Sequence, residues 1–80
     1  MDKETQEYYD NYFSLFRQKG WTQLMQDVGN NAMSINSVEA VKDANDMNFR
    51  KGQLNILAYL LNLEPAITNS YEELTENQDD

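Results

Sequence analysis

Apolar side chains recur at helical spacing in the first part of the chain. The rings of Tyr9, Tyr12, Phe13 and Phe16 are three and four residues apart. This spacing places them on one side of an amphipathic helix, which we predict from about Lys3 to Arg17. Asp2, Glu4 and Glu7 lie at the N-terminal end of this helix and Arg17 and Lys19 at its C-terminal end, as the helix dipole favours.

A second helical pattern follows Gly20 and contains Trp21, Leu24, Met25, Val28, Ala32 and Ile35. Gly20 comes directly after the basic residues Arg17 and Lys19, so two helices or one helix bent at Gly20 both fit the sequence. Short polar side chains gather around residues 30–37 and compete for backbone hydrogen bonds. We therefore expect the second helix to end near residues 34–37. Beyond it, the capping-box pair Asn36 and Glu39 predicts one more turn through Lys42.

The third helical pattern is the strongest and runs from about Asn45 to Leu63, with several candidate N-caps before it. Its apolar positions are Phe49, Leu54, Leu57, Leu60, Leu61 and Leu63. Pro65 disfavours helical geometry at the preceding residue and marks the end of this helix. Ser70 and Glu73 form a second capping-box pattern, which predicts a short helix near residues 71–75.

These elements predict an all-α fold. The second and third helices, about 15 and 19 residues long, are expected to form an antiparallel helical hairpin, joined by an additional N-terminal amphipathic helix and a short C-terminal helix. We expect residues 1–76 to form a single helical domain and residues 77–80 a frayed acidic tail. The expected core anchors are Phe16, Trp21, Phe49 and Leu57. Gly52 interrupts the third helix, so we expect a close crossing there, with Trp21 or a ring of the first helix above it.

Composition narrows the chemistry open to the chain. It has no cysteine and no histidine, so the commonest metal ligands and catalytic base are missing. No calcium loop, zinc helix, phosphate loop or nucleophile elbow is present. Adjacent Glu72 and Glu73 point to different sides of a helix and do not form a catalytic carboxylate pair. We therefore expect no enzyme, no cofactor and no metal site.

Charge and length limit the partners. The chain has 80 residues and a net charge of −8, which disfavours direct binding to nucleic acid. The longest apolar run, from Ile56 to Leu63, is far shorter than the roughly 20 residues that span a bilayer, so no membrane contact is expected. The N-terminus does not resemble a secretion signal, which favours synthesis inside a cell. A core of this size is small, so a second copy of the chain would be a natural support.

Three groups of side chains are candidates for contact with a protein. Tyr8 and Leu15 fall off the main aromatic stripe and are expected to be exposed, whereas the stripe itself is interpreted as core or self-association. Arg50 and Lys51 are candidates for polar contact. With Arg17 and Lys19 they form two basic pairs that a folded-back first helix could bring together, as an anion site or as a solvated surface.

The third group is acidic. The segment from Glu64 to Asp80 carries six carboxylates and no cation. Glu72 and Glu73 are its candidate contact residues. The segment either docks on a basic protein, as a mimic of a DNA backbone would, or only keeps the chain in solution.

Two segments resemble short proteins encoded among the virion genes of tailed bacteriophages. They are Tyr12-Phe13-Ser14-Leu15-Phe16 running into Gly20-Trp21-Thr22-Gln23-Leu24, and Phe49-Arg50-Lys51-Gly52-Gln53-Leu54 running into Leu60-Leu61-Asn62-Leu63-Glu64. The resemblance covers about two thirds of the chain. It implies a helical accessory protein of a capsid, a connector or an assembly intermediate, located in the virion or the host cytoplasm. It carries over no catalytic residue.

Two functions are therefore expected to compete. The leading one is a non-enzymatic phage structural or assembly protein that binds a virion protein, itself, or both through its helices. The alternative is an acidic phage inhibitor of a basic host protein that handles nucleic acid. A hydrolase that uses Asp or Glu with a metal lacks any paired ligand spacing.

Overall fold

The chain folds into helices joined by short connections. The structure is a computed structural model that describes residues 1–37 and 41–78, with side chains as far as residue 76. Within these residues it contains no strand and four α-helices: α1 (Lys3–Phe16), α2 (Lys19–Ile35), α3 (Ala44–Leu61) and α4 (Leu63–Gln78). The predicted all-α fold is confirmed.

The break between α1 and α2 falls earlier than the glycine predicted. Arg17 and Gln18 separate the two helices, and Gly20 lies in the first turn of α2. The alternative of two separate helices is confirmed, and the first ends at Phe16, one residue before the predicted Arg17. Neither a stop nor a bend lies at Gly20 itself. At the other end of α1, the Asp2 carboxylate accepts a hydrogen bond from the backbone N–H of Thr5 at 2.7 Å. This cap satisfies a free amide of the first turn and lowers the pKa of Asp2.

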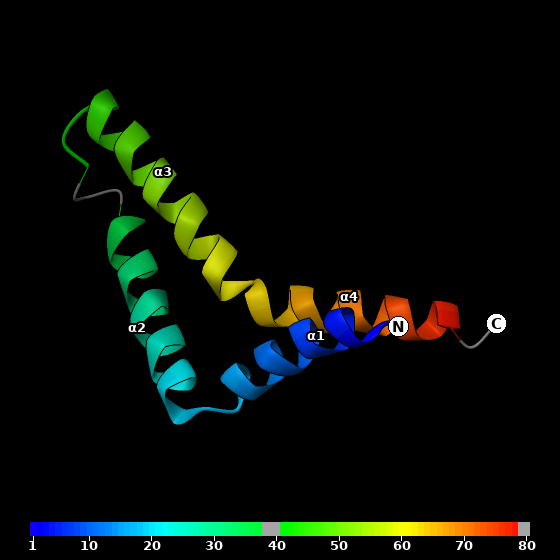
Figure 1. The fold of residues 1–80 in the computed structure, drawn as a ribbon. Helices are drawn as coiled ribbons and strands as arrows, with labels where there is room; N and C mark the ends of the chain where they lie inside the picture. Colours follow the sequence, from blue (N-terminus) through cyan, green and yellow to red (C-terminus); the bar gives the residue numbers. More distant parts are fainter. Residues whose placement is uncertain (38–40, 79–80) are drawn as a thin grey trace.

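The helices α2 and α3 lie side by side and run in opposite directions (Figure 1). Their connection is held by Arg50, whose Nη1 donates to the backbone oxygen of Ile35 at 3.0 Å and whose Nε donates to Asp46 Oδ2 at 3.0 Å. Asp43 caps α3, because its carboxylate accepts from the backbone N–H of Asp46 at 2.8 Å. The extra turn expected from Asn36 to Lys42 falls largely on residues 38–40, outside the described residues.

The last helix is longer than the sequence suggested. α4 begins at Leu63, directly after Asn62, and holds Pro65 in its first turn, where a missing N–H costs nothing. The end predicted for the third helix, at about Leu63, lies within two residues of the observed end at Leu61. The non-helical geometry expected at Glu64 and the separate short helix near residues 71–75 are wrong, because both segments lie inside α4. Ser70 lies inside α4 and does not cap it, because its Oγ is hydrogen-bonded to the Tyr9 hydroxyl at 2.6 Å. Of the expected frayed tail, residues 79–80 lie outside the described residues.

The two helix pairs give the chain an extended shape. α1 packs along α4, α2 packs along α3, and the pairs meet at an angle (Figure 1). The molecule measures 54 × 27 × 17 Å and its radius of gyration is 17.0 Å. A compact domain of this length would have a radius of about 12 Å. Within the described part of the chain, Tyr9, Trp21, Val28 and Ile67 are the buried side chains.

Trp21 is packed where the two pairs meet. The ring centroids of Phe16 and Trp21 are 5.0 Å apart, and the indole Nε1 of Trp21 donates to Glu64 Oε1 at 3.2 Å. Gly52 takes no part in such a contact, because a Cβ added to it would meet no atom within 4 Å. The close crossing expected at Gly52 is therefore absent from a single copy of the chain.

Candidate interaction surfaces

The aromatic residues of α1 divide between two sides of the helix. Tyr9 is buried and Phe13 is half-buried, and both rings contact Tyr71 of α4 with centroids 5.3 and 5.2 Å away. Phe16 is half-buried beside Trp21. These side chains hold α1 to the rest of the molecule and are not available to a partner.

The other side of α1 is open. We define the α1 surface as Tyr8, Asn11, Tyr12 and Leu15, which line a shallow hollow of about 320 Å³. Tyr8 is 52% exposed and Leu15 is 42% exposed. The Tyr8 and Tyr12 rings meet edge to face with centroids 5.2 Å apart. Tyr8 and Leu15, named from the sequence, thus lie together on one exposed apolar surface, and their part in binding stays a prediction.

Phenol side chains affect the titration of Tyr8. Partial desolvation of the Tyr8 hydroxyl raises its pKa, and the neighbouring Tyr12 hydroxyl raises it further. The phenols of Tyr9 and of Tyr59 on α3 act in the same direction. Tyr59 is itself exposed. Aromatic side chains with an apolar body and a polar end are typical of protein interfaces.

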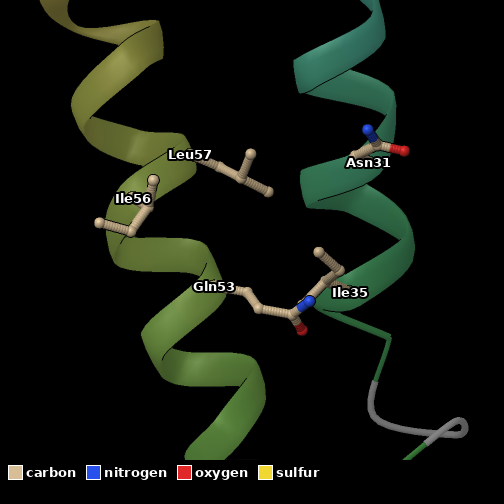
Figure 2. Close-up of a pocket in the computed structure, with 5 residues that line it drawn as sticks. All are labelled: Asn31, Ile35, Gln53, Ile56 and Leu57. Atoms are coloured by element: carbon tan, nitrogen blue, oxygen red, sulfur yellow. The ribbon is translucent and has the colours of Figure 1, made fainter.

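A second exposed surface follows the α2–α3 pair. Asn31, Ile35, Gln53, Ile56 and Leu57 line an open groove of about 520 Å³ between the two helices (Figure 2). Leu57 points towards α2, whereas Ile56 points away from it (Figure 2) and is 65% exposed. The groove therefore has an apolar wall that a single copy of the chain leaves uncovered.

The opposite side of the same pair carries a smaller groove. Its lining consists of Ala32, Met33, Asn36, Leu54, Ala58 and Leu61, around a volume of about 340 Å³. Met33 is 76% exposed. Both sides of the α2–α3 pair thus expose apolar side chains.

The four expected core anchors differ in how deeply the structure buries them. Trp21 is 7% exposed, whereas Phe16 and Leu57 are half-buried. Phe49 is 67% exposed, so its assignment to the core is wrong for a single copy. The physical reason is that α3 is apolar on several sides, and spacing alone does not show which side faces α2.

The two basic pairs do not come together. Arg17 and Lys19 flank the start of α2, whereas Arg50 lies beside Ile35 at the other end of that helix. A helix of 17 residues separates them, which is about 25 Å. The anion site considered for the four residues is therefore wrong. Arg50 binds Asp46 and the end of α2, and Lys51 is exposed.

The acidic residues of the C-terminal segment lie on an ordered helix. Glu72, Glu73 and Glu76 are exposed on α4, which carries no basic residue. Among the described residues, no three acidic side chains gather closely enough to form a metal-binding group. Across the described helices, none combines the length and the apolar character needed to cross a bilayer.

Sequence reasoning missed Ile56, Tyr59 and Met33 as exposed apolar residues. The signal was present in α3, where Phe49, Ile56 and Tyr59 repeat at steps of seven and three beside the leucines that face α2. In comparisons with known proteins, no family model, no curated protein and no solved structure matches the chain.

Proposed function

We propose that the chain is a non-enzymatic structural or assembly protein that acts through contacts between helices, of the kind encoded among the virion genes of tailed bacteriophages. The observation that supports this role is the amount of surface that the chain leaves open. Its accessible area is 6286 Å² for a mass of 9.3 kDa. A compact monomer of that mass exposes about 5,000 Å². The difference, about 1,300 Å², exceeds the roughly 800 Å² that each partner buries in a standard interface.

The α1 surface is the proposed contact with a virion protein. It combines the exposed phenol of Tyr8, the half-buried phenol of Tyr12, one leucine and a shallow hollow, without a charged side chain among its four residues. Such a surface suits an apolar side chain of a partner, with the polar ends of the phenols at its edge.

The test is association with particles. A tagged chain, expressed during infection, is expected in mature or precursor particles, or bound to one protein of the capsid region. The variant Tyr8→Ser with Leu15→Ser is expected to lose this association, whereas the control Met33→Ser on α2 retains it. A chain found only in the free fraction of the lysate would contradict the proposal.

One observation favours the second candidate function, binding of a basic host protein that handles nucleic acid. A mimic of a DNA backbone needs carboxylates on an ordered surface, and α4 presents Glu72, Glu73 and Glu76 in this way. This role predicts capture of a basic host protein at low salt and its release at high salt. Replacement of the three glutamates by glutamine would abolish that capture and leave particle association unchanged.

A further inference from the structure

The helix α3 carries more apolar surface than α2 covers. Leu54 and Leu57 are half-buried between the two helices, while Phe49 and Ile56 on another side of α3 are exposed. Apolar side chains that share one side of a helix are normally buried together. Phe49 and Ile56 do not meet this expectation in a single copy.

The uncovered side has the spacing of a helix-packing seam. Phe49, Gln53 and Ile56 are separated by four and three residues, as are the inward positions of a heptad. On α2, Asn31 and Ile35 line the same groove, and Leu24 lies two turns before Asn31 on the same side of the helix. We define the α2–α3 face as Leu24, Asn31, Ile35, Phe49, Gln53 and Ile56.

Charge indicates what covers this face. None of its six side chains ionises, although the chain as a whole has a net charge of −8. Asp27 is exposed on the same side of α2, three residues after Leu24 and four before Asn31, so one carboxylate borders the face. The groove lined by Asn31, Ile35, Gln53 and Ile56 has no carboxylate, so two copies can join along it without placing like charges opposite one another, and the acidic α4 helices remain outside the contact. A basic partner would find only Asp27, at the edge of this face, to pair with.

The accessible surface that the chain leaves open is large enough for contact with a second copy. The surface of about 1,300 Å² that the chain exposes beyond a compact monomer is within the range that each subunit buries in an obligate homodimer. Two antiparallel helix pairs packed face to face form a four-helix bundle, in which each helix buries a second apolar side.

We propose that two copies of the chain join through the α2–α3 face into a four-helix bundle. In this bundle Phe49 and Ile56 fill the space between the pairs. Asn31 and Gln53, which line one groove (Figure 2), form a polar layer with their counterparts. A single polar layer in an apolar seam fixes the register and the number of helices, at a cost in stability. The glycine at position 52, next to this seam, allows a close approach of the second copy.

The mass of the purified chain in solution tests the contact. Light scattering is expected to give twice the chain mass of 9.3 kDa. Ile56→Asp is expected to give the mass of one chain, because a carboxylate then lies in the seam. Met33→Asp is the matched control: Met33 is even more exposed than Ile56 but lies on the opposite side of the pair, so this variant keeps the doubled mass. Circular dichroism verifies that both variants remain helical.

A separate variant tests whether Asn31 and Gln53 fix the register of the dimer. Asn31→Leu combined with Gln53→Leu is expected to keep the association and to give several masses in place of one, because register is no longer fixed. These measurements use the purified chain alone, so their failure is distinguishable from a failure of the virion role. A wild-type chain with the mass of one copy would overturn the proposal. A doubled mass that persists in Ile56→Asp, or that is lost in Met33→Asp, would overturn it as well.

Discussion

The indole of Trp21 and the carboxylate of Glu64 join the start of α2 to the start of α4. The Nε1–Oε1 distance is 3.2 Å, and 43 residues separate the two positions in the chain. Trp21 is buried at 7% exposure and its ring lies against Phe16. The Trp21 side chain of α2 thus contacts both α1 and α4 where the two pairs meet.

Removal of the Glu64 carboxylate, which accepts from the Trp21 indole, is expected to weaken the contact between α2 and α4. Glu64→Ala leaves the indole N–H without its partner and should lower the free energy of unfolding by about 1 kcal/mol. Glu64→Gln retains an acceptor oxygen and should cost less. The chain has one tryptophan, so its emission reports on this site alone. A shift to longer wavelength in Glu64→Ala, absent in Glu64→Gln, is the expected result, and equal spectra would contradict it.

A second bond holds α1 to α4. The Tyr9 hydroxyl and Ser70 Oγ are 2.6 Å apart, and Tyr9 is buried. Tyr9→Phe and Ser70→Ala should each lower the free energy of unfolding by about 1 kcal/mol. Because both changes remove the same bond, the double variant should lose less than the two losses added together. Strict additivity in chemical denaturation would show that the bond contributes nothing in solution.

The two mid-helix glycines are expected to respond differently to alanine. Gly29 of α2 and Gly52 of α3 both have open space around an added Cβ. In a single copy, either change should raise the free energy of unfolding by up to about 1 kcal/mol through helix propensity. In the proposed dimer, Gly52→Ala places a methyl beside the second copy. Thermal unfolding should therefore show a clear gain for Gly29→Ala and a smaller gain or a loss for Gly52→Ala, and equal gains would contradict a close approach at Gly52.

Acid is expected to weaken the connection between α2 and α3 through Asp46. The backbone N–H of Lys42, followed by the side chain of Arg50, donates to the Asp46 carboxylate and lowers its pKa. A carboxyl with a lowered folded-state pKa stabilises the fold above its unfolded pKa of about 3.9. That stabilisation is lost as the pH falls through the lower, folded-state pKa.

The variant Asp46→Asn should therefore be less stable than the wild type at neutral pH. Its stability should also fall less on acidification. Unfolding curves recorded from neutral pH down to about pH 2 test this expectation. Asp27→Asn, at an exposed position of α2, is the control. An equal loss of unfolding free energy on acidification in the wild type and in Asp46→Asn would contradict the assigned role of Asp46.

Helix existence was predictable from the sequence, because apolar spacing extends over many residues. The rings of α1 and the leucines of α3 sufficed to predict an all-α fold. Signals carried by one or two residues were less reliable. Pro65 indicated non-helical geometry at Glu64, and the pair Ser70 and Glu73 indicated a helix start, yet these residues all lie inside α4. The Tyr9 partner of Ser70 lies 61 residues away, beyond any local pattern.

The exposed surfaces were only partly predictable for the same reason. Tyr8 and Leu15 stand off an otherwise one-sided aromatic stripe, so the pattern itself indicated that they face outward. Phe49 belongs to a helix with apolar residues on several sides, where spacing gives no direction. The exposure of Phe49 depends on where α2 packs against α3, which the spacing of apolar residues in one helix does not determine.

Contacts between two copies give the most direct test of the account. Equal amounts of isotope-labelled and unlabelled chain are mixed, and nuclear Overhauser effects are recorded only between a labelled and an unlabelled copy. We predict effects from the Ile56 methyl groups of one copy to α2 or α3 side chains of the other, Phe49 among them. A spectrum without effects between copies, or with effects confined to Tyr8 and Leu15, would contradict the assignment of the α2–α3 face to a second copy.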